Sequence, residues 1–176
     1  RQMCIRDSFM GYAGDRVTAW LHPELDPGDT GYQILQSLYA IGSGGLFGLG
    51  YGKSRQKYLY LPFQYNDYIF AVICEELGLV GAMAIVALFA VTILRGYWIA
   101  LNARDRFSTV LAAGLVTLIA VQTILNLCVV TNLLPSTGIA LPFFSYGGTA
   151  LAVNLGEMGI VLGISRGRNR RKIQEA

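Results

Sequence analysis

Three carboxylates stand close together in the segment YLYLPFQYNDYIFAVICEELGLVG, where an aromatic, proline-marked stretch leads into a long apolar run. Asp67 lies at the start of the apolar run, and Glu75 and Glu76 lie within it. An acid beside a reacting hydroxyl can act as a general base or can help to bind a metal ion. A helix cap is the simpler interpretation of Asp67, because an acid there satisfies free backbone N–H groups. Three acids together favour a functional role.

Helix geometry relates these acids to one another. On an ideal helix Asp67 and Glu75 are about 80° apart in projection, and Glu75 lies roughly 12 Å further along the axis. Ionisable groups at that depth in a membrane are costly, so they usually face a cavity or a partner charge. We expect Glu75 to support Asp67 from below and Glu76 to pair with a neighbouring helix.

Two other features precede the acids. Arg55 and Lys57 lie in KSRQKYLYLP, and such cations suit a phosphate group; a solvated charge run is the alternative. The glycine-rich stretch GSGGLFGLGYGKS permits tight turns and close backbone approach. It lacks the GxxxxGK[ST] spacing of a phosphate-binding loop. A flexible loop and a backbone wall beside a polar ligand both remain open.

The scarcity of histidine and cysteine excludes other chemistry. His22 is the single histidine, and Cys4, Cys74 and Cys128 have no metal-ligand spacing. A zinc site or a histidine-based triad would need more partners.

Composition indicates a membrane protein. Of 176 residues, 53% are hydrophobic and 14% are charged, whereas soluble domains carry about 25% charged residues. A spanning helix needs roughly 20 apolar residues, which predicts transmembrane helices over 67–97, 108–132 and 147–165. The fold class is therefore an all-α polytopic membrane protein, with 1–176 as one domain.

The basic run RGRNRRK predicts the topology. Basic residues favour the cytoplasmic side, which places the tail 166–176 inside and the segments 9–66 and 133–146 outside. Binding of nucleic acid or acidic lipid is the alternative for the tail. Within 9–66, the stretch YQILQSLYAIGSGG has apolar residues near helical spacing and predicts a short amphipathic helix at the membrane surface: Ile34, Leu35, Leu38 and Ile41.

Polar residues recur inside the predicted spans. Gln122 and Asn126 share one helix face, and Asn154 and Glu157 share another. Such residues commonly join membrane helices to one another. Between them, PSTGIALPFFSYGGT is typical of a re-entrant outer loop shielded by protein.

Four stretches in order carry a resemblance: GYQILQSLYAIGSGGLFGLGYGKSRQKYLYLP, NDYIFAVICEELGLVG, LLPSTGIALPFFSYGGTAL and MGIVLGISR. The chain resembles the SEDS family of bacterial cell-wall synthesis over about residues 10–170, and is more similar to the FtsW and SpoVE branch than to RodA. The resemblance implies the last three helices of a fold of roughly ten transmembrane helices. Residues 1–8 do not fit and suggest a fragment or an assembly scar.

The resemblance also implies an activity. Members are peptidoglycan glycosyltransferases that polymerise lipid II at the outer face of the bacterial cytoplasmic membrane during division or sporulation. The implied partners are a class B penicillin-binding protein and divisome proteins, without nucleic acid, and the implied cofactor is a divalent cation, Mg or Mn. A lipid II flippase using Glu75, Glu76 and Glu157, or a non-catalytic scaffold for the transpeptidase, are the alternatives.

Site residues follow from the matched motifs. The essential acid of the LPE-x-x-x-DFIF motif falls on Asp67, which could also bind the metal. The chain has Phe63 where the motif has Glu and Tyr68 where it has Phe, which weakens a metal site built on that Glu. Six further residues are expected to bind substrate: Arg55, Lys57, Gln33, Ser145, Gly147 and Gly148.

Overall fold

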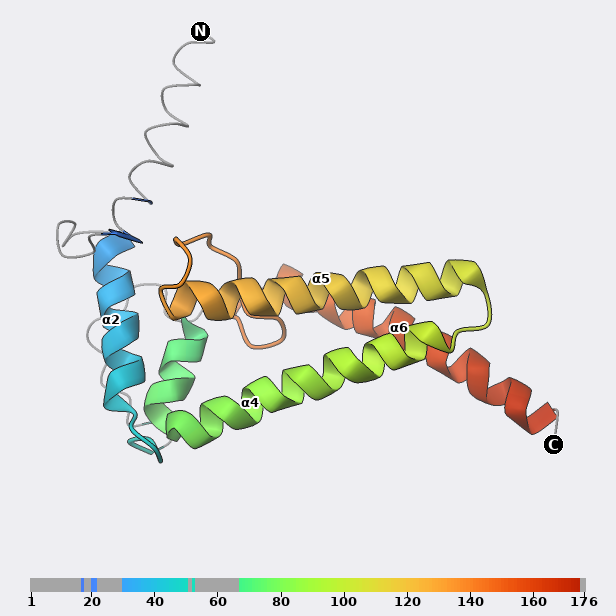
Figure 1. Ribbon diagram of the computed structural model, residues 1–176, viewed down its shortest axis with the longest axis horizontal. Helices are drawn as coiled ribbons and strands as arrows, with labels where there is room; N and C mark the ends of the chain where they lie inside the picture. Colours follow the sequence, from blue (N-terminus) through green and yellow to red (C-terminus); the bar gives the residue numbers. More distant parts are fainter. Residues whose placement is uncertain (1–16, 18–19, 22–29, 51, 53–66, 175–176) are drawn as a thin grey trace, which may run out of the picture. The chain divides into compact units, whose positions relative to one another are not determined.

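The computed structural model describes residues 17, 20–21, 30–50, 52 and 67–174, with the side chains of 30 and 168–174 left out. Arg55, Lys57, Phe63, His22 and Cys4 lie outside these residues. Every regular element in the described part is a helix (Figure 1): α2 (Thr30–Ser43), α4 (Ile69–Leu101), α5 (Arg106–Val130) and α6 (Gly148–Gln174). This confirms the predicted all-α class.

Three of these helices are long and apolar enough to cross a membrane: Ile69–Leu101, Arg106–Val130 and the first part of α6, Gly148–Gly167. Their bounds differ from the predicted ones by a few residues. The clearest difference is at the end, where α6 continues through the basic run to Gln174. Arg and Lys are good helix formers, so a loss of hydropathy does not end a helix.

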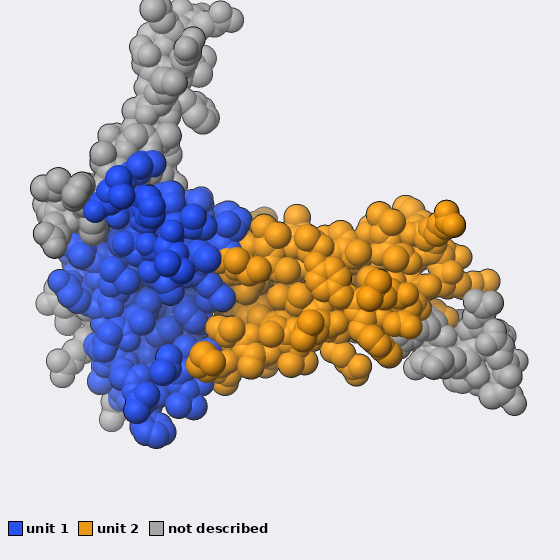
Figure 2. Space-filling view, in the orientation of Figure 1, with its two compact units in different colours: residues 1–82, 125–139 blue, residues 83–124, 140–176 orange. Residues whose placement is uncertain are grey.

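The chain divides into two compact units, which Figure 2 colours separately. The first comprises residues 1–82 and 125–139, and the second comprises 83–124 and 140–176. Helices α4 and α5 each contribute to both units.

In the first unit, α2 buries small residues. The predicted helix is present, but Leu38 is 36% exposed while Ser37 and Ala40 are fully buried with Ile34. The hydroxyl of Ser37 donates to the carbonyl oxygen of Ile34 at 2.7 Å and reaches that of Val130 at 3.5 Å. Small residues let the α2 backbone come close to the last turn of α5. Of the apolar residues at helical spacing in the sequence, Ile34 is thus buried but Leu38 is not.

In the second unit, α4 and α5 form a hairpin. The phenol oxygen of Tyr97 and the hydroxyl of Thr117 are 2.8 Å apart. A Cβ added at Gly96 would lie 2.6 Å from Cγ2 of Val116. The absence of a side chain at Gly96 therefore allows α5 to pack closely on α4. The rings of Phe89 and Phe144 also meet, with their centroids 5.9 Å apart.

Candidate functional site

The span α4 is interrupted at Gly78, where the helix is kinked (Figure 1). Its backbone angles, φ 68° and ψ −168°, lie in a region that glycine alone adopts readily. An interrupted helix leaves carbonyl groups free at the end of its first part and N–H groups free at the start of its second part. Inside a membrane such groups must find partners within the protein.

The glycine-rich segment 44–50 supplies these partners with its own backbone. Four hydrogen bonds of 3.0 to 3.2 Å join it to α4: Leu49 N to Glu75 O, Gly50 N to Glu76 O, Leu79 N to Gly45 O and Val80 N to Leu46 O. A Cβ at Gly48 would collide with the carbonyl group of Glu76. The interpretation as a flexible loop needs correction for residues 44–50, because their backbone is bound to α4. A backbone wall beside a polar ligand stays a prediction.

Glu75 and Glu76 are the last acids before the interruption. They are 1% and 8% exposed, so both acids are buried within the protein. Oxygen Oε1 of Glu76 is buried and has no hydrogen-bond partner among the described residues. The predicted pairing of Glu76 with a neighbouring helix therefore stays a prediction.

Asp67 lies in a turn just outside α4, two positions before its first residue, Ile69. Tyr68 stands between them and accepts the first-turn hydrogen bond from the N–H of Ala71 at 3.0 Å. The predicted helical relation between Asp67 and Glu75 is therefore wrong, because Asp67 is not on the helix. Asp67 is half-buried.

A residue on α5 holds the backbone at Asp67. The side-chain nitrogen of Asn126 donates to the carbonyl oxygen of Asp67 at 2.9 Å and to that of Ile139 at 2.7 Å. Asn126 is 1% exposed. The segment 67–68 and the loop that follows α5 are therefore joined through one amide.

The same loop lies beside the carboxylate of Asp67. Gly138 has φ 69°, and a Cβ built on it would lie 3.7 Å from Oδ2 of Asp67. The loop leaves α5 with Leu133 and Leu134, whose N–H groups both donate to the carbonyl oxygen of Cys128. Asp67 thus has one wall formed by the predicted re-entrant loop.

Asn126 is the residue that sequence reasoning did not place in the site. The spacing of Gln122 and Asn126 predicts a junction between helices, but both amides bind carbonyl oxygens of the loop after α5, and Asn126 also binds that of Asp67, just before α4. Gln122 donates to Ala140 at 3.2 Å. The sequence signal for this role was the presence of two amides one helical turn apart, near the end of a helix that leads into an irregular apolar loop.

The other predicted substrate residues fall into two sets. Gln33 is half-buried on α2, in the unit that contains Asp67. Ser145, Gly147 and Gly148 belong to the second unit, where Ser145 is 9% exposed and Gly148 begins α6. A common groove formed by both sets stays a prediction, as do the roles of Arg55 and Lys57.

The described residues do not by themselves form a metal site. No group of three or more His, Cys, Asp or Glu side chains comes together in this part of the chain. Asp67 can offer one carboxylate, but the Glu of the family motif is replaced by Phe63. Among the described residues, Asp67 therefore offers one carboxylate ligand for a divalent cation, without further acids grouped around it.

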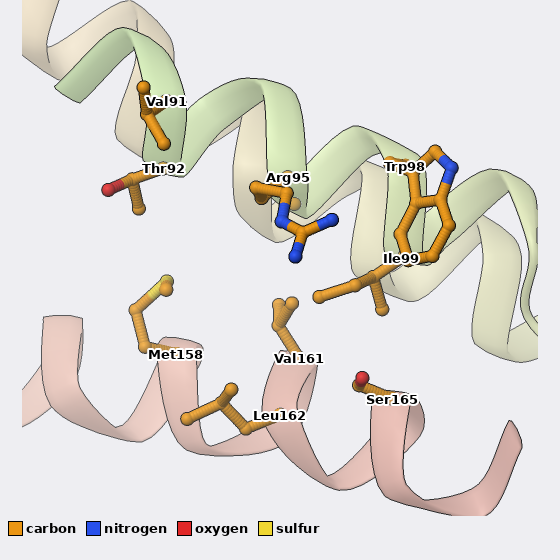
Figure 3. Close-up of a pocket in the computed structure, with 10 residues that line it drawn as sticks. Val91, Thr92, Arg95, Trp98, Ile99, Met158, Val161, Leu162 and Ser165 are labelled. Carbon is orange, nitrogen blue, oxygen red and sulfur yellow. The ribbon is translucent and has the colours of Figure 1, made fainter. Parts of the chain in front are cut away.

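A cavity of about 400 Å³ lies between α4 and α6 in the second unit (Figure 3). Its cation is Arg95, whose guanidinium carbon lies 5.2 Å from the centroid of the Trp98 ring. Its other lining residues are apolar or neutral: Val91, Thr92, Gly96, Ile99, Met158, Val161, Leu162 and Ser165. None of these described lining residues is an acid, so they offer no carboxylate as a general base.

Comparison with known proteins decides the family. The family model described as "Cell cycle protein", FtsW/RodA/SpoVE, matches residues 4–170. The chain belongs to the FtsW/RodA/SpoVE family. The SEDS resemblance is thereby confirmed, and with it a multi-pass membrane protein.

Individual FtsW/RodA/SpoVE relatives match most of the chain. "Stage V sporulation protein E" of Bacillus subtilis is 50% identical over 155 residues, and "Probable peptidoglycan glycosyltransferase FtsW" of Geobacter metallireducens is 48% identical over 154. Each alignment covers 88% of this chain but only 42% and 41% of the relative. The chain thus spans about two fifths of the length of these curated relatives.

Two solved structures share the fold. A chain from "a peptidoglycan synthase complex" that coordinates polymerization and crosslinking matches with a TM-score of 0.72 and 30% identity, over 89% of this chain and 42% of that one. An aspartate-to-alanine mutant of the rod shape determining protein RodA from Thermus thermophilus matches with a TM-score of 0.59 and 32% identity, over 75% and 40%.

Proposed function

We propose that this FtsW/RodA/SpoVE protein is a peptidoglycan glycosyltransferase that polymerises lipid II in division or sporulation. Support comes from relatives named probable peptidoglycan glycosyltransferases, which are 48% and 49% identical to it. The match to a chain of a peptidoglycan synthase complex adds further support.

The observation that carries the proposal is the setting of Asp67. Asp67 is a half-buried acid two positions before a candidate membrane span, and its backbone carbonyl accepts a hydrogen bond from Asn126. Polymerisation joins a sugar hydroxyl of one lipid II to the anomeric carbon of a second glycan chain. A new C–O bond forms there, the bond to the lipid-linked pyrophosphate breaks, and the hydroxyl proton passes to Asp67 as general base.

The leaving pyrophosphate needs positive charge. Arg55 and Lys57 are the proposed cations of the chain. A divalent cation, Mg or Mn, would supply further positive charge when bound, and ligation of that cation is the alternative role of Asp67. The proposed setting is the outer face of the bacterial cytoplasmic membrane. The proposed partners are a class B penicillin-binding protein, whose transpeptidase would crosslink the strands, and divisome proteins.

A lipid II flippase is the second candidate. Glu76 and Glu157 each keep a buried carboxylate oxygen without a hydrogen-bond partner among the described residues, and acids inside spans are typical of transport pathways. A flippase moves lipid II across the bilayer without forming polymer. A scaffold for the transpeptidase would do neither.

The full-length protein with its transpeptidase partner tests the proposal. The complex is incubated with lipid II and a divalent cation, and the glycan products are separated on a gel. The variants are Asp67→Asn, which keeps the shape of the side chain but not its basicity, and Asp105→Asn. Asp105 is an exposed acid between α4 and α5 and serves as the matched control.

We expect polymer from the parent and from Asp105→Asn, and none from Asp67→Asn. Normal polymerisation by Asp67→Asn would remove the general base from the proposal but leave the polymerase. If intact complexes of all three proteins made no polymer, the polymerase would be wrong. Lipid II translocation in vesicles would then separate the flippase from the scaffold.

A further inference from the structure

We propose that Asn126 is a positioning residue, which fixes Asp67 against the loop 133–146 so that the carboxylate faces the reacting hydroxyl. The role in turnover rests on the proposed function of Asp67 as general base. The link itself rests on geometry alone.

The amide of Asn126 suits this link. A side-chain amide carries two N–H donors on one nitrogen, and Asn126 directs them to the carbonyl oxygens of Asp67 and Ile139, at 2.9 and 2.7 Å. Both distances are those of good N–H···O hydrogen bonds. Asn126 therefore joins two chain segments that are far apart in the sequence.

Neither acceptor is fixed by a helix. Asp67 lies before α4, and Ile139 lies in the extended part of the loop between α5 and α6. Where no regular backbone ladder holds a segment, hydrogen bonds from side chains decide its position. Asn126 is itself on the regular helix α5 and is 1% exposed, so the donor is rigid and shielded from water.

Burial makes the link hard to replace. In a low-dielectric interior a hydrogen bond is stronger, and an unpaired carbonyl group is correspondingly costly. Loss of the two donors would remove the Asn126 hydrogen bond from both carbonyl groups and weaken the hold on Asp67 beside Gly138. A misplacement of about 1 Å at a reacting group can cost about 10²-fold in rate.

The chain offers a matched control one helical turn away. Gln122 also carries an amide and also binds the loop, through the carbonyl oxygen of Ala140 at 3.2 Å. No hydrogen bond to Asp67 is found for Gln122 in the described part of the chain. A variant that loses the Gln122 amide therefore disturbs the loop but leaves the bond to Asp67 in place.

The test uses lipid II polymerisation by the full-length protein in complex with its transpeptidase. Asn126→Asp keeps the side-chain shape but replaces the two donors by an oxygen, and Asn126→Gln keeps the amide on a longer chain. We expect kcat to fall about 10²-fold in Asn126→Asp while KM for lipid II is unchanged. Asn126→Gln should recover part of the loss, and Gln122→Leu should lose far less.

Hydrogen exchange of the same complexes tests the link independently of turnover. Backbone amides of 68–71 should exchange faster in Asn126→Asp than in the parent or in Gln122→Leu. Amides of 136–141 should exchange faster than in the parent in both variants, because both side chains bind this loop. Unchanged exchange, or an unchanged kcat in an intact Asn126→Asp complex, would overturn the proposal. A third outcome is faster exchange in Asn126→Asp together with normal polymerisation by Asp67→Asn. It would confirm the hydrogen-bonded link but reject Asp67 as general base, and it would overturn the role of Asn126 in turnover.

Discussion

The backbone N–H of Leu79 donates a hydrogen bond to the carbonyl oxygen of Gly45 at 3.0 Å. This bond joins the second part of a broken transmembrane helix to a glycine-rich segment that lies far away in the sequence. Leu79 would otherwise be an unpaired donor, because the interruption at Gly78 removes its helical acceptor. The break and the glycine-rich segment therefore form one structural unit.

Replacing Gly78 by alanine should destabilise the protein. Its φ of 68° and ψ of −168° are strained for any residue with a side chain, and a Cβ would also meet the backbone of Gly48 and Leu46. We expect a loss of at least about 1–3 kcal/mol, measured as a lower midpoint of thermal unfolding of the full-length protein in detergent.

The control for this variant is Gly114→Ala. Gly114 lies within α5 and has no atom within 4 Å of a built Cβ, so alanine should be neutral or stabilising by roughly 0.5–1 kcal/mol. Equal midpoints for the two variants would show that the α4 break does not depend on Gly78.

Gly96→Ala tests the close packing of α4 and α5. The added Cβ would lie 2.6 and 3.0 Å from the two Cγ atoms of Val116. Overpacking typically costs about 1–3 kcal/mol, which should outweigh the roughly 0.5–1 kcal/mol gained by alanine in a helix. The measurement is again the thermal midpoint of the full-length protein.

A double variant makes this prediction specific. Val116→Ala removes both Cγ atoms, so Gly96→Ala should cost less in that background than alone. Additive effects of the two changes would contradict the contact between Gly96 and Val116.

Glu76→Gln tests the buried carboxylate before the break. A charge at this depth needs a cation or a donor, and none of the described residues serves its Oε1. We expect the partner to come from outside the described residues. Breaking such a buried pair should cost about 3 kcal/mol, whereas exposed Asp105→Asn should change stability by less than about 0.5 kcal/mol. A stability equal to the parent's would mean that Glu76 has no such partner.

The sequence predicts the spans well and the site in part. Hydropathy alone places three transmembrane helices within a few residues of those observed, and it puts Asp67 at the mouth of the first. Periodicity also predicts α2, but not that Ser37 and Ala40 rather than Leu38 are buried. Hydrophobicity does not encode how closely two backbones approach.

The break in α4 could not be predicted in the same way. Gly78 is one glycine in a long apolar run, and a single glycine is tolerated in a membrane helix. The interruption is stable because residues 44–50 satisfy its free groups, and that pairing is between distant parts of the chain. The bond between Asn126 and Asp67 is also of long range. Local patterns carry no information about either.

The four hydrogen bonds between 44–50 and α4 also have a mechanical consequence. Pulling this segment away would expose four donors and four acceptors, each costing several kcal/mol in a lipid environment. A displacement of α2, which runs directly into this segment, would therefore be passed to the backbone of α4 on both sides of Gly78. Asp67 lies directly before the first turn of α4, so a displacement of α2 would reach Asp67 through hydrogen bonds in which Asp67 takes no part.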